Sequence, residues 1–207
     1  MIRRFRLNLR FMAWFMARGS DRYETLVGTR KRRLLKDLQG VVLELGSGTG
    51  NNLRYLPAGL RLVGIEPNPF MHSHFHEEAR AMGSSALQVR ARAESLPFPD
   101  NSVDAVLSTL VLCSVGELGD VLKEVLRVLK PGGRFIFVEH VAAPEGSGLR
   151  RLQALVRPVW RRIGDGCEPD RTLVEDFRKA GFRELTLDRF FLPVPIVSPH
   201  IAGFARK

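Results

Sequence analysis

Between residues 41 and 140, short apolar runs alternate with segments of helical periodicity. Val and Leu dominate these runs, and each spans five to seven residues. Such runs are typical of strands buried in a parallel sheet. The predicted strands cover residues 41–45, 61–66, 86–91, 103–109 and 134–140. Strands that alternate with helices through short loops predict a doubly wound α/β sheet.

Helices are predicted between these strands. One covers residues 69–82, with Pro69 near its first turn. Another covers residues 117–129, where Leu and Val repeat as one apolar stripe. The sequence KPGG at 130–133 is expected to end that helix.

Beyond residue 145 the pattern becomes helical and then extended. Residues 149–163 place Leu, Val, Trp and Ile on one side and five arginines around them, with a kink expected at Pro158. A further helix is expected from about 170 to 180. The segments 183–190 and 200–207 read as an antiparallel strand pair that closes the sheet. The proline-rich segment between them is expected to be a loop, because proline is excluded from central strands.

The first 39 residues read as two helices with a break near Gly19 and Ser20. In the first helix, Phe5, Met12 and Met16 recur at helical spacing among arginines. A basic helix of this kind can lie in a membrane interface. It can also pack on the domain as a lid with solvated arginines, and the sequence leaves both interpretations open.

Charge is concentrated in this same segment. The net charge is +10, and residues 1–40 hold 11 Lys or Arg against 3 Asp or Glu. Basic segments attract nucleic acid, anionic lipid or acidic partners. The rest of the chain is nearly neutral and has no basic sheet interleaved with aromatic residues, so no nucleic-acid partner is expected. A chain of 207 residues suits one domain with a full core.

The two cysteines, Cys113 and Cys167, form no CxxC pair. This spacing predicts neither a disulfide framework nor a metal site, and it fits a reducing, cytoplasmic compartment. No apolar run reaches the ~18–20 residues that span a bilayer. A contact with membrane would therefore be peripheral.

A glycine-rich loop, LELGSGTG, follows the first predicted strand at residues 43–50. A phosphate-binding loop of the GxxxxGK[ST] type requires a lysine that this loop lacks. A dinucleotide fingerprint, GxGxxG, would place its third glycine at position 51, where this chain has Asn51.

Two carboxylates indicate a different ligand. Glu66 ends the second strand 20 residues after Gly46, where an acid can accept both hydroxyls of a ribose. Glu44 precedes the loop and disfavours a pyrophosphate, but it suits an ammonium group. S-adenosylmethionine has an amine and a ribose and lacks phosphate, so the sequence predicts this cofactor.

Four motifs carry a family resemblance. ELGSGTG, GIEPN, RAESLPFPDNSVD and EVLRVLKPGGRFIFVEH, in this order, resemble the class I S-adenosylmethionine-dependent methyltransferases over residues 41–140. The resemblance implies a Rossmann-like, mostly parallel seven-stranded sheet with an antiparallel C-terminal strand pair. It also implies a methyltransferase domain at 40–207, preceded by the basic segment 1–39.

The same resemblance assigns residues to the cofactor. Glu66 would bind the ribose, Thr109 and Glu44 would face the methionine end, and Ala93 and Glu94 would lie at the adenine edge. The remaining residues implied are Gly46, Ser47, Gly48, Thr49, Gly50 and Asn52 around the methionine half, and Pro67, Asn68 and Met71 around the adenine.

A narrower resemblance extends to the C-terminus. TLVLCSV (109–115), EHVAAPEG (139–146), RPVWRRIGDGC (157–167) and PHIAGFARK (199–207) are similar to the methyltransferase-like thiol S-methyltransferases. Animal members of that group methylate small alkyl thiols at endoplasmic reticulum and lipid-droplet membranes. They begin with a long hydrophobic anchor, where this chain has only a short basic helix. They also tend to have cysteine where this chain has Ser47.

Methyl transfer from a sulfonium is an in-line displacement, so it depends mostly on alignment and on excluding water. A thiol has a pKa near ~8.5, and one modest base would suffice to ionise it. His140 ends the fifth strand and is the first candidate for that base. Asp165 and His200 are weaker candidates, and a purely structural His140 is the competing interpretation.

Other acceptors and roles stay open at this point. A quinone carbon or a phospholipid amine would suit the same apolar surroundings. RNA methylation and cofactor binding without catalysis are further alternatives that the sequence makes less favourable.

Overall fold

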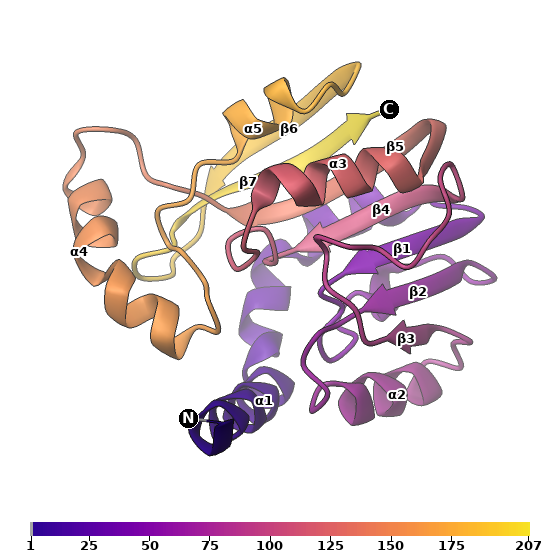
Figure 1. Cartoon of the computed structure of the whole chain (residues 1–207), viewed down its shortest axis with the longest axis horizontal. Helices are drawn as coiled ribbons and strands as arrows, with labels where there is room; N and C mark the ends of the chain where they lie inside the picture. Colours follow the sequence, from indigo (N-terminus) through magenta and orange to yellow (C-terminus); the bar gives the residue numbers. More distant parts are fainter. Residues whose placement is uncertain (1) are drawn as a thin grey trace.

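A seven-stranded sheet with helices on both faces forms the centre of the computed structural model (Figure 1). The structure describes residues 2–207, apart from the side chains of residues 2–8, 11, 12 and 14–20. The strand order is β3-β2-β1-β4-β5-β7-β6. Strands β3, β2, β1, β4 and β5 pair in parallel, and β7 runs antiparallel between β5 and β6. The predicted fold class is thereby confirmed.

The strands follow the predicted apolar runs closely. Their bounds are β1 Val41–Leu45, β2 Arg61–Ile65, β3 Leu87–Val89, β4 Val103–Thr109, β5 Leu129–His140, β6 Glu184–Phe191 and β7 Pro199–Arg206. The helices are α1 Ile2–Leu35, η1 Leu53–Tyr55, α2 His72–Ala81, α3 Leu118–Val128, α4 Gly148–Ile163 and α5 Val174–Lys179.

Alternate side chains of the strands fill two cores, because successive residues of a strand point to opposite faces. Leu43 and Phe137 pack with α3 and α5 on one face of the sheet. Val42 and Ile136 pack on the other face with η1, α2 and the end of α1. Burial on both faces explains why these strands read as continuous apolar runs.

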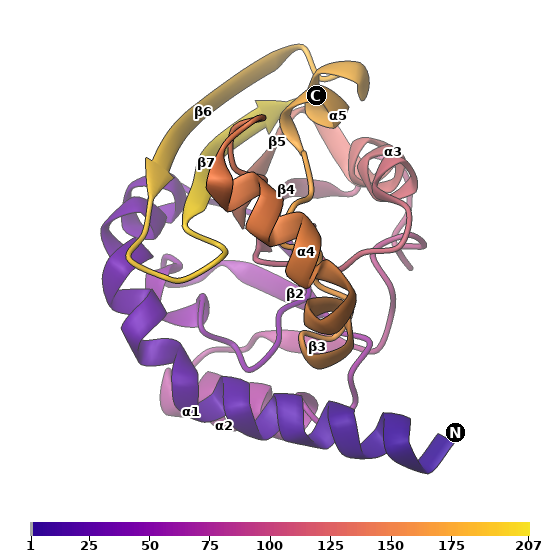
Figure 2. The ribbon, with the colours of Figure 1, turned by 90° about the vertical axis from the view of Figure 1, so that its left-hand side faces the viewer.

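The N-terminal segment differs from the prediction. It forms one helix, α1, instead of two helices broken near Gly19 and Ser20, and Figure 2 shows it changing direction along its length. Glycine inside a helix costs about 1 kcal/mol, which is too little to end a helix that tertiary packing stabilises. That packing comes from the C-terminal half of α1, where Val27 and Leu35 are fully buried. The side chains of Phe5, Met12 and Met16 lie outside those described.

The KPGG segment also differs from the prediction, because it is part of a strand. Residues 130–133 belong to β5, where they form a bulge: Val103 pairs with Leu129, and Ala105 pairs with Arg134. Gly132 takes a positive φ of 77° in this bulge. Helix α2 begins at His72, so Pro69 lies in the preceding turn. Pro158 is accommodated inside α4.

Candidate functional site

The glycine loop leaves β1 at the carboxyl end of the sheet, beside the point where the strand order reverses. Ligands of doubly wound folds bind at this position. Gly46 and Gly48 take positive φ angles of 54° and 52°. A Cβ atom at Gly46 would lie 2.5 Å from Cγ2 of Val111, so the loop requires glycine there.

Neighbouring strands hold the loop in place. The backbone N–H of Ser47 donates to the carbonyl of Ile65 at 3.1 Å. Gln88 of β3 donates through Nε2 to Ser47 Oγ at 2.7 Å and to the Gly48 carbonyl at 3.0 Å. Sequence reasoning missed Gln88, and a polar residue inside a short apolar strand was its only signal.

Glu66 lies under this loop and is buried. Its carboxylate accepts the backbone N–H groups of Gly48 at 3.1 Å and Asn68 at 2.8 Å. Burial raises the pKa of Glu66, and these two hydrogen bonds oppose the shift. The predicted ribose carboxylate is therefore fixed in orientation by the loop and by the turn after β2.

Helix α1 passes over the turn that follows Glu66. Asn68 Nδ2 donates to the carbonyl of Leu9 at 3.0 Å, and Arg10 lies 5.7 Å from the ring centre of Phe70. Met71 is buried and Pro67 is exposed. The predicted adenine border thus lies next to the N-terminal half of α1.

Glu44, Asn52 and Thr109 form a buried polar network at the other end of the loop. Asn52 Nδ2 donates to Glu44 Oε1 at 2.5 Å and to Thr109 Oγ1 at 3.1 Å. Burial raises the pKa of Glu44 to about 7. Glu44 Oε2, Asn52 Oδ1 and Thr49 Oγ1 are buried and have no hydrogen-bond partner among the described residues. Unpaired acceptors of this kind fit the ammonium group of an amino-acid ligand.

A buried ion pair on α1 lies close to this network. Lys31 is 1% exposed and its Nζ lies 2.7 Å from Glu24 Oε1. Burial lowers the pKa of Lys31, although Glu24 and Glu44 both favour its charged form. Sequence reasoning missed both residues, because charged residues on an amphipathic helix normally face solvent.

The predicted adenine-edge residues lie in the loop after β3. Ala93 is buried. Glu94 accepts the backbone N–H of Gly116 at 2.8 Å and lies 3.4 Å from Arg92. This carboxylate therefore links the loop after β3 to the loop after β4.

The end of β5 carries a further buried acid, Glu139. It accepts the hydroxyl of Ser108 at 2.6 Å and the backbone N–H of Val111 at 3.0 Å. Burial raises its pKa to about 7, against these hydrogen bonds. Glu139 was not predicted as a site residue, and it holds the turn at Leu110, whose φ is 56°.

His140 comes next on β5 and meets both cysteines. His140 Nε2 lies 3.1 Å from Cys167 Sγ, and the ligand atoms of Cys113, His140 and Cys167 all lie within 4.8 Å of one another. Among the residues that the structure describes, these three are close enough to share a metal ion. Their sequence spacing gave no sign of this.

The ring of His200 lies next to His140, and the ring of Tyr23 lies next to His200. The ring centres of His140 and His200 are 6.3 Å apart, and those of Tyr23 and His200 are 5.8 Å apart. Tyr23 Oη, His140 Nδ1 and His200 Nε2 are all buried, and none of them has a hydrogen-bond partner in the part of the chain that the structure describes. Burial lowers the pKa of His200 to about 4, so this ring is neutral near pH 7. Asp165, the other weaker candidate, is exposed.

Comparison with known proteins identifies the family. The methyltransferase domain model matches residues 43–137. Rat thiol S-methyltransferase TMT1B is 37% identical over 95% of this chain and 86% of its own length, and human TMT1A is 35% identical over 96% and 86%. The chain belongs to this methyltransferase family. A solved S-adenosylmethionine-dependent methyltransferase from Methanosarcina mazei shares the fold, with a TM-score of 0.66, 24% identity and coverage of 81% and 92%.

The methyltransferase is therefore an enzyme whose cofactor is S-adenosylmethionine. The residues at the site suit this cofactor. Carboxylate and amide oxygens that lack a partner among the described residues lie where the cofactor's ammonium group is predicted to bind. Those oxygens belong to Glu44 and Asn52, and a second acid, Glu66, lies across the loop.

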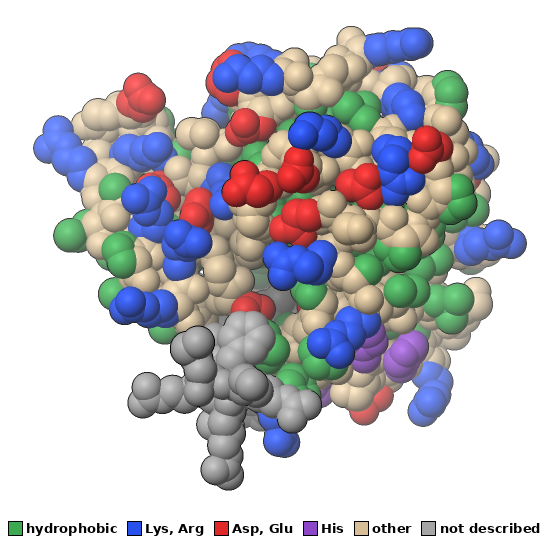
Figure 3. Space-filling view, viewed as in Figure 1, with side chains coloured by type: hydrophobic (Ala, Val, Ile, Leu, Met, Phe, Trp, Pro, Cys, Tyr) green, Lys and Arg blue, Asp and Glu red, His purple; other side chains and the backbone are tan. Residues whose placement is uncertain are grey.

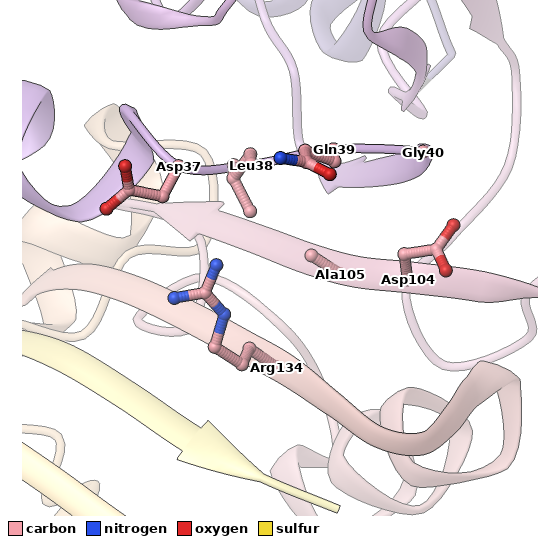
Figure 4. A pocket seen from close by; sticks show the side chains of 7 residues that line it. All are labelled: Asp37, Leu38, Gln39, Gly40, Asp104, Ala105 and Arg134. Atoms are coloured by element: carbon pink, nitrogen blue, oxygen red, sulfur yellow. The ribbon is translucent and has the colours of Figure 1, made fainter.

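A depression of about 520 Å³ lies at the opposite end of the methyltransferase (Figure 4). It is lined by Gly40 and Asp104 at the amino ends of β1 and β4. Asp104 is already bound by the Val41 N–H at 2.8 Å and by Lys130 at 2.6 Å. The transferred methyl group would be remote from this depression.

No helix among the described residues of the methyltransferase is both long enough and apolar enough to cross a membrane. One helix nevertheless exposes apolar side chains. Gln153 is the fully buried residue of α4, and it donates to the Ile196 carbonyl at 2.8 Å. The apolar stripe of α4 faces outward, with Leu155 77% exposed and Val159 61% exposed.

Proposed function

We propose that this methyltransferase transfers the methyl group of S-adenosylmethionine to a small thiol. One observation carries the proposal. Four motifs that resemble the thiol S-methyltransferases lie far apart in the sequence, and their Cys113, His140, Cys167 and His200 meet in one cluster at the ends of β4 and β5. The curated relatives named above are thiol S-methyltransferases, which supports the same acceptor.

In the proposed reaction, His140 takes the proton of the acceptor thiol. The thiolate attacks the methyl carbon in line, a new sulfur–carbon bond forms, and the sulfonium–carbon bond breaks. The electron pair of that bond stays on the cofactor's sulfur, which leaves S-adenosylhomocysteine, a methyl thioether and one proton. Because the sulfonium is already activated, orientation and exclusion of water supply most of the acceleration.

The proposed cofactor contacts follow the predicted residues. Glu66 binds the ribose hydroxyls, and Glu44 receives the ammonium group with Asn52 and Thr109 around it. Gly46, Ser47, Gly48, Thr49 and Gly50 bring backbone close to the methionine half. Pro67, Asn68 and Met71 border the adenine, with Ala93 and Glu94 at its edge.

Residues 1–39 are proposed to cover the site of the domain at 40–207. The hydrogen bond from Asn68 to Leu9 and the contact between the rings of Tyr23 and His200 support this arrangement. We also propose a cytoplasmic enzyme in peripheral contact with a membrane surface. The exposed stripe of α4, flanked by arginines, supports that contact (Figure 3).

The deciding experiment is an acceptor panel. Purified protein with S-adenosylmethionine is assayed against small alkyl thiols, quinones and phospholipids, as wild type and as His140→Ala. We expect thiols to be methylated, with kcat reduced at least about tenfold in the variant because a general base contributes roughly 10²–10⁴. Turnover of quinones or phospholipids without turnover of thiols would refute the thiol assignment.

Glu66→Ala tests the cofactor site separately. The variant loses a charged acceptor, and such hydrogen bonds contribute about 1.5–3 kcal/mol each. We expect affinity for S-adenosylmethionine to fall at least about tenfold by calorimetry. Glu77→Ala, an exposed acid on α2, is the control and should bind normally. Equal affinity of the two variants would show that Glu66 is outside the cofactor site.

A further inference from the structure

Three segments of the chain bring two sulfurs and an imidazole together. Cys113 lies in the turn after β4, His140 ends β5, and Cys167 lies in the loop after α4. Their ligand atoms all lie within 4.8 Å of one another, and His140 Nε2 is 3.1 Å from Cys167 Sγ. Around a tetrahedral zinc ion, sulfur and nitrogen ligands are roughly 3.6 Å apart, as follows from their bond lengths to the metal. The cluster therefore matches the spacing of a metal site.

Backbone hydrogen bonds hold the two cysteine segments against each other. The N–H of Glu168 donates to the Cys113 carbonyl at 2.9 Å. The guanidinium of Arg171 donates to the carbonyls of Leu112 at 3.2 Å and Val115 at 2.8 Å. These contacts do not involve the sulfurs, so the two thiols are brought together before any ligand binds.

The ligand types favour a thiophilic divalent ion. Thiolate and imidazole ligands together suit zinc, and two cysteines with one histidine leave the fourth position of a tetrahedral ion open. Each thiol releases its proton to solvent when it binds the metal. Two thiolates balance the charge of the ion, so the occupied site leaves no net charge in the protein interior.

Burial of the cluster is incomplete. Cys113 is 2% exposed and His140 is 3% exposed, whereas Cys167 is half-buried. The ligands are thus shielded from bulk water, which strengthens their interaction with an ion. Cys167 nevertheless gives the cluster contact with solvent, and a metal site requires such an entry path.

The ring of His200 supplies an acceptor for the outer shell of this site. His200 lies opposite His140 in the pairing of β5 with β7, and the two ring centres are 6.3 Å apart. Its Nδ1 donates to the Ser198 carbonyl at 3.0 Å, so in a neutral ring Nε2 bears the lone pair. A histidine that binds a metal usually donates the N–H of its other nitrogen to an acceptor. His140 Nδ1 and His200 Nε2 are both buried and have no other partner among the described residues.

We propose that Cys113, His140 and Cys167 bind one zinc ion, and that the bound ion blocks methyl transfer by occupying the imidazole of His140. A neutral imidazole has one lone pair, and the metal takes it, so His140 can no longer accept the proton of a thiol. This blocking step rests on the proposed thiol methylation. The metal site rests on the positions of the three ligands.

Zinc binding to the full chain tests the site without any turnover. The protein is stripped with a chelator under reducing conditions and titrated with zinc against a chromophoric competitor. We expect one zinc ion per chain, bound more tightly than micromolar, and at least about tenfold weaker binding in Cys113→Ser, His140→Gln and Cys167→Ser. A wild-type protein that binds zinc no more tightly than these three variants would overturn the site.

A histidine pair on α2 provides the matched control. His72 and His76 are four residues apart on that helix, so they face the same side and are a competing place for zinc. His76 is exposed, and His76→Gln should bind zinc as tightly as wild type. Loss of the tight zinc in His76→Gln would overturn the proposal.

Cobalt in place of zinc reports the ligands directly and needs no variant that has to fold. A tetrahedral ion with two thiolates gives strong visible absorption and intense sulfur-to-metal bands in the near ultraviolet. We expect both features after one equivalent of cobalt is added to wild type, and their loss when zinc is then added. A pale, octahedral cobalt spectrum would contradict the proposed ligands.

Activity then tests the blocking step. Zinc buffered to saturate the site should lower turnover of a small alkyl thiol, kept in large excess over the metal, at least about tenfold, and a chelator should restore turnover. The residual activity of Cys167→Ser should not respond to the same zinc. Undiminished turnover by zinc-loaded wild type would overturn the blocking step. If wild type methylates no thiol with or without zinc, the proposed function fails, and the titration and cobalt spectra still decide the metal site.

Discussion

At the scale of single residues, the site depends on carboxylates that burial keeps close to their protonated form. Glu44 lies on β1 and Glu139 on β5, with β4 between them, and each has a pKa raised to about 7 by burial. A water-exposed glutamate would ionise near pH 4.3. Ionisation of each carboxyl therefore lowers the stability of the folded protein as pH rises. Such a loss of stability is usual where buried acids prepare a site for a cation.

Glu44→Gln should remove the loss of stability that ionisation of Glu44 causes. The unfolded chain ionises Glu44 above about pH 4.5 while the folded chain resists until about pH 7, so wild type loses stability across that interval. We expect the variant to match wild type at pH 4.5 and to be more stable above pH 7, by on the order of 3 kcal/mol. Urea unfolding at several pH values measures this. A difference that does not grow with pH would contradict the raised pKa.

At the scale of elements, strand β2 and the glycine loop are closely packed against each other. Gly64 pairs with Glu44 across β2 and β1. A Cβ atom at Gly64 would lie 2.3 Å from Ser47 Oγ and 2.6 Å from Ser47 Cβ. The loop cannot yield freely, because Gln88 also holds Ser47.

Gly64→Ala should therefore displace the loop. We expect a loss of about 1–3 kcal/mol in unfolding free energy, typical of overpacking, and at least about tenfold weaker binding of S-adenosylmethionine. Gly119→Ala is the matched control. That glycine lies in α3 with open space around it, so alanine should stabilise the protein by up to about 1 kcal/mol. Normal cofactor affinity in Gly64→Ala would show that the loop position tolerates movement.

Helix α1 is attached to the sheet by a charged pair as well as by apolar packing. Lys31 and Glu24 are both buried, and removing one partner of such a pair leaves an uncompensated charge. Lys31→Met should lower the free energy of unfolding by about 3–5 kcal/mol. Lys36→Met removes a lysine that is 67% exposed on the segment just after α1, and it should change stability little. Denaturant unfolding compares the two, and equal effects would mean that the buried pair does not anchor α1.

At the scale of the whole molecule, charge and exposed apolar surface coincide. The net charge is +10, and the outward stripe of α4 lies among arginines (Figure 3). An amphipathic helix of this composition can lie in the interface of an anionic membrane. The long α1 and the projecting α4 both extend beyond the sheet in Figure 1, where a flat surface could meet them.

Binding to vesicles tests this contact. The full chain should sediment with vesicles that contain phosphatidylserine at low salt, and less so at high salt because surface charges are screened. Leu155→Glu with Val159→Glu should weaken binding at least about tenfold. Leu87→Glu, at the 61% exposed position on the edge strand β3, is the control and should bind almost normally. An equal loss of vesicle binding in the α4 double variant and in Leu87→Glu would show that the added negative charge alone weakens binding. If the wild-type protein does not bind the vesicles, the proposed membrane contact is wrong.

The sequence by itself determined the fold and the cofactor. Apolar runs such as 41–45 and 103–109 gave the strands, because residues buried on both faces of a sheet leave a local, continuous pattern. The spacing of Gly46, Glu44 and Glu66 indicated S-adenosylmethionine, because a loop and two strand ends are close in sequence as well as in space. The break at Gly19 was wrong, since packing of the rest of α1 outweighs one residue's propensity.

Only the tertiary structure brings together the residues that we propose for the acceptor side. Cys113, His140 and Cys167 come from three separate segments, and no spacing rule connects residues that meet only after the sheet has formed. The same holds for Lys31, which reads as a solvent-facing lysine until α1 is placed on the sheet. Local patterns report the periodicity of one element, whereas burial and hydrogen-bond partners depend on which elements meet.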